Sequence, residues 1–157
     1  IEMLDLCGYG DVFLDRGLFD KIDYAKKVNP DFKIYISTTG IAMNEKKWDY
    51  IVEKVDILKF SIYGMSKDVY EEVMANVKYD RAHENILGFL EKNKKAENKV
   101  YTIGNYIVLK ENEHEFQDWV DFWEPKLSEI YAWKPHNYVD GREYRIKKVV
   151  VDLHKGL

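Results

Sequence analysis

The hydrophobic and polar positions of this 157-residue chain change their period several times along its length. Short runs rich in β-branched and aromatic residues are typical of buried strands. Between these runs, apolar residues spaced three and four positions apart predict one face of a helix. The predicted strands are residues 3–7, 33–37, 57–63, 100–109 and 130–133, and the predicted helices are residues 18–25, 48–55, 66–74, 79–93 and 112–123.

Strands that alternate with helices predict an α/β fold, in which crossover helices cover a parallel sheet. Two architectures fit this order: a doubly wound open sheet, and part of a (β/α) barrel. In both, ligands bind at the carboxyl ends of the strands. The residues at these ends are mostly glycines and small polar residues: Gly8, Gly10, Asp11, Ser37, Thr38, Thr39, Ser61, Asn105, Lys134 and His136. This set suits a polar, zwitterionic small molecule with a sugar, and suits neither a metal hydrolase nor a nucleophilic triad.

The segment Gly8-Tyr9-Gly10-Asp11 follows the first predicted strand. Glycines at this place let the backbone turn sharply and let a ligand approach the main chain closely. A carboxylate on the same turn can hold an amine by a charge-assisted hydrogen bond. The alternative is an ordinary strand-to-helix turn of an α/β protein.

The amino-acid composition argues against several classes of function. The net charge of −4 argues against a general nucleic-acid interface. We expect no membrane contact, because no apolar run approaches the length of a membrane span. The single cysteine excludes an internal disulfide and a thiolate-built metal site within this sequence, and it favours a cytoplasmic location. We expect Cys7 to be a small buried residue and His83 to lie in a surface context.

Residues 112–115, Asn-Glu-His-Glu, have the spacing of a capping box. Asn112 is therefore predicted to cap the helix that follows, with Glu115 bonding back to it. Phe116, Trp119 and Trp123 form the apolar stripe predicted for that helix.

Taken in order, the strand ends resemble those of the radical S-adenosylmethionine (SAM) enzymes. Residues 8–15 resemble the Gly-Gly-Glu-Pro turn of that family, and residues 36–40 are similar to its Ser-Thr-Asn-Gly segment. Residues 60–64 resemble its Ser-Ile-Asp-Gly segment, and residues 112–115 resemble its Asn-x-x-Glu helix start. Residues 133–142 resemble members that continue into a cysteine-rich SPASM extension.

The resemblance implies a partial (β/α) TIM-like barrel over residues 1–142 that lacks the first strand. Residues 143–157 would connect it to a C-terminal extension. The implied cofactors are SAM and a [4Fe–4S] cluster. The implied reaction is reductive cleavage of SAM to a 5′-deoxyadenosyl radical, which abstracts hydrogen from a substrate such as a peptide or protein. The implied SAM contacts are Gly8, Tyr9, Gly10, Asp11, Ser37, Thr39, Ser61 and Asn105, with Trp133 and His136 on the substrate side.

The three-cysteine motif that ligates the cluster in this family is not in the sequence. We therefore expect the cluster ligands to lie outside this chain, which would be the inactive central fragment of an enzyme. Two alternatives remain: a degenerate barrel that acts as a non-catalytic binding or interaction module, and an unrelated doubly wound domain that binds a nucleotide.

Overall fold

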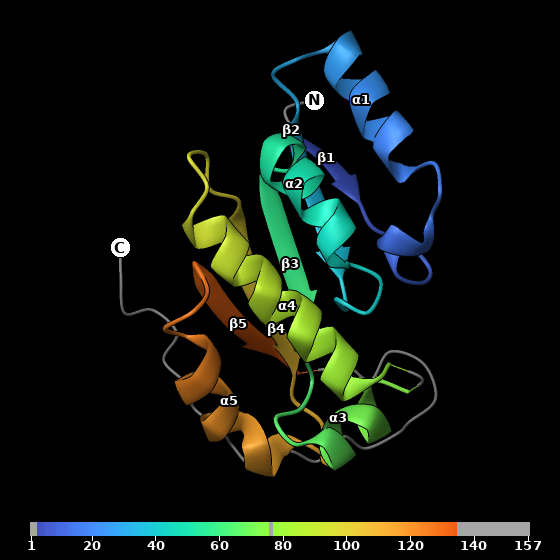
Figure 1. Ribbon diagram of the computed structural model, residues 1–157. Coiled ribbons are helices and arrows are strands. Elements are labelled where there is room, and N and C mark those ends of the chain that lie inside the picture. The colour runs from blue at the N-terminus through green and yellow to red at the C-terminus, as the bar shows by residue number, and fades with distance from the viewer. Residues whose placement is uncertain (1–2, 76, 135–157) are drawn as a thin grey trace.

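The computed structural model describes residues 3–75 and 77–134, in which five parallel strands form one sheet (Figure 1). The strands pair in chain order, each with the next. A doubly wound sheet would reverse its order at a switch point, so that alternative is wrong. The arrangement is that of a partial (β/α) barrel, as the sequence predicted. The strands are β1 (Met3–Leu6), β2 (Lys33–Thr38), β3 (Ile57–Ser61), β4 (Tyr101–Ile107) and β5 (Glu129–Trp133).

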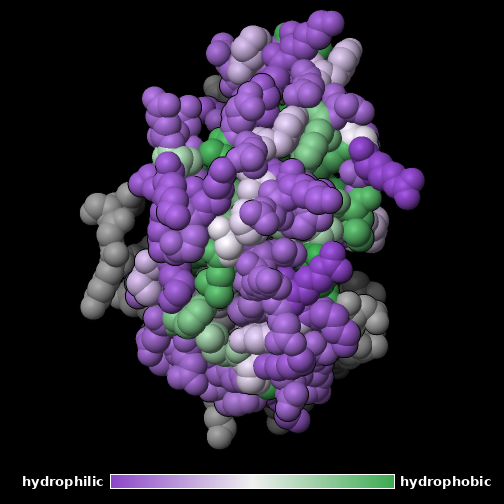
Figure 2. Space-filling view, in the orientation of Figure 1, coloured by the Kyte–Doolittle hydropathy of each residue, from purple (hydrophilic) through white to green (hydrophobic). Residues whose placement is uncertain are grey.

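The helices follow the strands as crossover connections, and α2 and α4 lie in front of the sheet in Figure 1. Their outward surface is largely hydrophilic, with only small apolar areas between the elements (Figure 2). No helix among the described residues is both long and apolar enough to cross a bilayer. The helices are α1 (Leu18–Val28), α2 (Glu45–Lys54), α3 (Lys67–Val73), α4 (Tyr79–Lys94) and α5 (Phe116–Trp123), with short 3-10 helices η1 (Val12–Leu14) and η2 (Glu113–Glu115).

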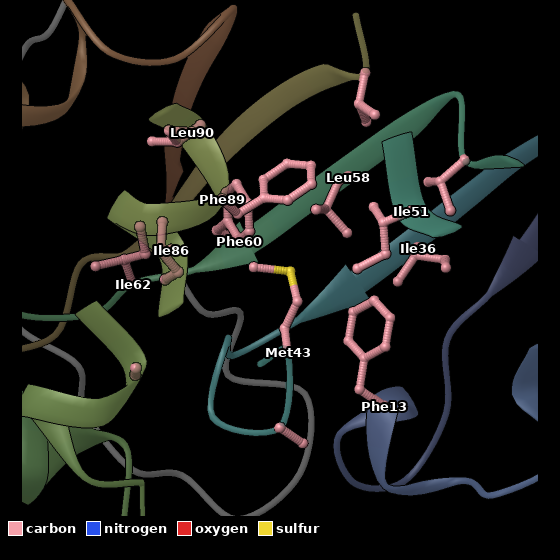
Figure 3. Close-up of a cluster of buried hydrophobic side chains, with 14 of the residues drawn as sticks. Phe13, Ile36, Met43, Ile51, Leu58, Phe60, Ile62, Ile86, Phe89 and Leu90 are labelled. Carbon is pink, nitrogen blue, oxygen red and sulfur yellow. The ribbon is translucent and has the colours of Figure 1, made fainter. Parts of the chain in front are cut away.

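The helix side of the sheet forms the hydrophobic core. Alternate strand residues point to this side, and the strand register places Ile36 beside Leu58. Both are fully buried, as are Phe60 and Phe89. Figure 3 shows Met43, from the segment after β2, pointing toward these rings. The helices therefore cover this side of the sheet, and α2 and α4 contribute Ile51 and Phe89 to its core.

The opposite side of the sheet contributes no residue to this core. We call it the inner face, because it faces the interior of a (β/α) barrel. The register places on it Met3, Asp5, Lys33, Tyr35, Ser37, Ile57, Lys59, Ser61, Tyr101, Ile103, Asn105, Ile107, Glu129, Tyr131 and Trp133. Most of these residues carry polar groups, so this face is chemically distinct from the helix side.

Two expectations about single residues are wrong. Cys7 is exposed, because it follows the last residue of the edge strand β1, where no helix covers it. His83 is only 6% exposed, because it lies on the inward side of α4 among the rings of Tyr70, Tyr79 and Trp123.

The predicted capping box is also wrong. Asn112 is fully buried, and its side-chain amide donates to the Tyr63 carbonyl over 2.8 Å. Glu115 accepts hydrogen bonds from the backbone amides of Met65 and Ser66, so it caps the start of α3 instead of its own helix. Both side chains tie the start of α5 to the end of β3. These partners lie about fifty residues away in the chain, so local spacing could not identify them.

The burial of His83 makes the stability of the fold depend on pH. Burial lowers the pKa of His83 from 6.5 to about 4, so the ring stays neutral when folded. As the pH falls below 6.5, the unfolded chain takes up a proton that the folded protein does not, and the free energy of unfolding falls. We expect a loss of about 2 kcal/mol from this residue between about pH 7 and about pH 5, measured by chemical denaturation at both values.

A His83→Phe variant keeps an aromatic ring in the cluster but cannot titrate. Its free energy of unfolding should therefore fall less over the same pH interval than that of the wild type. His114→Gln, at an exposed position, is the matched control and should keep the wild-type pH dependence. An unchanged pH dependence in His83→Phe would contradict the assignment.

Candidate functional site

The glycine turn after β1 leads into η1 and leaves open space beside its backbone. A Cβ atom added at Gly8 or Gly10 would meet nothing within 4 Å. Gly10 has a φ of +92°, a conformation that favours glycine. Asp11 ends the turn and caps η1, since its Oδ1 accepts from the Phe13 amide over 3.1 Å.

The other oxygen of Asp11 binds the end of β2. Oδ2 accepts from the Thr38 hydroxyl at 2.7 Å, the Thr39 amide at 2.8 Å and the Thr39 hydroxyl at 2.7 Å. The carboxylate thus ties the β1 turn to the neighbouring strand end. Oδ2 accepts three of the four hydrogen bonds to Asp11, whereas Oδ1 accepts only one and can accept another.

The turn and the strand ends enclose a small hollow of about 160 Å³. Six of the residues predicted to contact SAM come together there, although the chain separates them by up to 53 positions. The hollow is lined by Cys7, Gly8, Gly10, Asp11, Ser37, Thr38, Thr39 and Ser61. Cys7 and Thr38 were not among the predicted SAM contacts. Cys7 could have been predicted from the two-residue period of a strand, because it follows Met3 and Asp5 on the inner face.

The remaining predicted site residues lie elsewhere. Tyr9 projects fully into solvent and does not line the hollow. Asn105 is 4% exposed, and its amide donates to the Tyr63 hydroxyl at 3.1 Å. Its carbonyl oxygen accepts from the Trp133 indole at 3.0 Å, so a predicted cofactor residue and a predicted substrate residue are in direct contact. His136 lies outside the described residues. The roles of these residues in binding stay predictions.

Tyr63 extends this hydrogen-bonded pair, since its hydroxyl accepts from the Asn105 amide. Burial raises the pKa of Tyr63, although the nearby Ser61 hydroxyl and the charge of Lys59 partly oppose the shift. The phenol is therefore neutral and can both donate and accept. Tyr63, Asn105 and Trp133 form a hydrogen-bonded series that reaches the end of β5.

The described residues contain no group of three or more acidic, cysteine or histidine side chains suited to a metal ion. A hydrogen bond to Asp5 and the negative charge of Asp5 raise the pKa of the Cys7 thiol. Metal-binding cysteines have the opposite shift, because the thiolate is the ligand. Cys7 therefore contributes polar surface to the hollow and is a poor metal ligand.

A larger depression of about 540 Å³ lies at the amino ends of the strands. Its lining includes Asp56, which accepts from the Ile34 amide at 2.8 Å and pairs with Lys33 at 3.0 Å. These contacts join β2 to the start of β3, so the charged residues Asp56 and Lys33 have a structural role here. Parallel βα folds bind ligands at the carboxyl ends, so the smaller hollow is the candidate site despite its size.

A parallel βα sheet with a polar hollow over the carboxyl ends of its strands defines a small-molecule-binding protein of the (β/α)-barrel class. The family model described as the radical SAM superfamily matches residues 6–122, which is most of the chain. The chain belongs to this superfamily, and its general function is of the radical SAM type. A search of curated proteins found no match.

The hydrogen bonds of Asp11 predict a structural cost for its replacement. Asp11→Asn removes the charge and turns one acceptor oxygen into a donor, so it should lower the free energy of unfolding by about 2 kcal/mol. Ser37→Ala is the control, because the Ser37 hydroxyl makes no hydrogen bond in the part of the chain that is described; its effect should stay below about 0.5 kcal/mol. Urea denaturation measures both. Equal stabilities of Asp11→Asn and the wild type would show that the carboxylate does not tie the strands.

Proposed function

We propose that this chain is the central part of a radical SAM enzyme and that SAM binds in the hollow at the carboxyl ends of β1, β2 and β3. One observation carries this proposal. Six residues selected from separate sequence motifs line a single hollow, within the segment that matches the family. A shared location is what a common ligand requires.

The groups in the hollow fit the polar parts of SAM. The unused acceptor position of Asp11 Oδ1 would receive the methionine amine, and the open backbone at Gly8 and Gly10 would let the ligand lie against the main chain. The Ser37 and Ser61 hydroxyls would donate to the carboxylate or the ribose. These residues orient the cofactor; the chemistry that it supplies when bound is abstraction of a hydrogen atom from substrate.

The residues do not fit an iron–sulfur cluster. The whole sequence has one cysteine, and the described residues hold no cluster of metal-binding side chains. We derive no step through the cluster and place its ligands outside this sequence. A SPASM extension, a cytoplasmic location and a peptide or protein substrate belong to the same proposal. Trp133, joined to Asn105, would face that substrate.

The second candidate function is a non-catalytic barrel that binds a ligand or a partner. The single cysteine of the sequence favours it, since one thiol cannot ligate a cluster by itself. An enzyme cleaves SAM, whereas a binding module does not. The full-length protein, reconstituted with iron and sulfide without oxygen, forms 5′-deoxyadenosine from SAM if it is an enzyme, and forms none if it is a binding module.

Filling the hollow should weaken SAM binding without disturbing the fold. Gly8→Val adds a branched side chain in open space next to the proposed ligand, and we expect SAM affinity to fall by at least about tenfold, or about 1.4 kcal/mol. Equilibrium dialysis of the full-length protein with radiolabelled SAM measures this change.

Gly17→Val is the matched control, because Gly17 precedes α1 outside the hollow and its added Cβ would make only ordinary contacts, the nearest at 3.5 Å. It should keep wild-type SAM affinity. Equal affinities of Gly8→Val and Gly17→Val would place SAM elsewhere, and the absence of SAM binding by the wild type would reject the proposed function.

A further inference from the structure

Lys59 lies near the middle of the inner face. It precedes Ser61 by two residues on β3, so both side chains point to the same side of the sheet. The strand rise places Lys59 roughly 6–7 Å deeper than Ser61, toward the amino ends of the strands. The register sets Ser37 beside it on β2 and Ile103 beside it on β4. Lys59 is thus below the hollow proposed for SAM and does not line it.

Two tyrosines from different strands surround the Lys59 ammonium group. Its Nζ lies 5.5 Å from the centre of the Tyr35 ring. Burial disfavours the charge of Lys59, but the polar hydroxyl groups of Tyr35 and Tyr131 outweigh burial and raise the pKa of Lys59. Tyr131 reaches Lys59 from β5, two strands away. The three side chains therefore form one cationic, hydroxyl-bearing cluster across the sheet.

In the described part of the chain, no carboxylate forms an ion pair with this cluster. Of the two acids on the inner face, Glu129 accepts from the Tyr101 hydroxyl at 3.1 Å. Asp5 lies beside Tyr35 in the strand register, and its charge acts on Tyr35 and on the Cys7 thiol. A half-buried cation without a counter-ion is unfavourable, and an anionic ligand would remove this cost.

We propose that Lys59, with Tyr35 and Tyr131, binds a carboxylate group of the substrate, and that the substrate class is therefore anionic. The inference rests on the proposed function in calling the ligand a substrate. The ammonium group and the two hydroxyls supply donors from three directions to two carboxylate oxygens. For a peptide substrate, the group would be an acidic side chain or the C-terminal carboxylate. None of these three residues lines the hollow, so the anchor and the groups proposed to hold SAM are different residues.

The test uses glutarate as a carboxylate probe and glutaramide as its neutral analogue, each titrated into the full chain and followed by ligand-observed NMR. We expect the wild type to bind glutarate in preference to glutaramide, and Lys59→Met to lose about tenfold in glutarate affinity. Lys59→Arg keeps the charge and should keep most of the binding. Lys126→Met is the matched control, because Lys126 also lies over an aromatic ring, that of Phe122, but on the outer side of the molecule. Circular dichroism checks that each variant is folded.

The same variants are then tested for SAM binding by equilibrium dialysis. Unchanged SAM affinity in Lys59→Met, together with lost glutarate binding, supports a substrate anchor. A parallel loss of SAM affinity would assign Lys59 to the carboxylate of SAM and overturn the proposal, as would equal glutarate binding by Lys59→Met and wild type, or no preference for glutarate over glutaramide. Absence of SAM binding by the wild type would reject the proposed function but not the glutarate result, so the two failures are distinguishable.

Discussion

The candidate site depends on the Asp11 carboxylate, which joins two strand ends that the sheet hydrogen bonds do not reach. The β1–β2 ladder ends at Leu6 and Ile36, and beyond it the β1 turn could lie in many positions. Asp11 fixes the turn by accepting three hydrogen bonds from Thr38 and Thr39 on one oxygen. Because these donors belong to the end of β2, the turn and the strand end are fixed to each other at the edge of the hollow.

This role changes the interpretation of an acid on a glycine turn. The sequence offered two alternatives, a ligand contact and an ordinary turn, as if they excluded each other. In the structure, one oxygen of Asp11 is fully used by β2 while the other binds only the Phe13 amide. A single carboxylate can therefore fix the backbone and keep an acceptor position for an amine, which gives a rigid ligand contact on an otherwise flexible turn.

Most of the fold could be predicted from the sequence, because the strands and helices follow from local periodicity and their order defines the sheet. The convergence of Gly8, Asp11, Ser37 and Ser61 also followed, since parallel strands bring their carboxyl ends together. The contacts of Asn112 and Glu115 could not, because their partners are distant in the chain. Their spacing imitates a local cap, and tertiary hydrogen bonds decided the outcome instead.

The inner face shows why residues in the middle of strands escaped the sequence interpretation. Lys59 interrupts an apolar strand, and beside Leu58 and Phe60 it reads as an ordinary outward-facing residue. The environment of the Lys59 side chain depends on Tyr131, which lies seventy-two positions away in the chain and two strands away in the sheet. In a parallel sheet with one face packed by helices, any charge on the other face must meet water, a partner or a ligand. The charged and polar residues of that face therefore cannot be interpreted from their own strand alone.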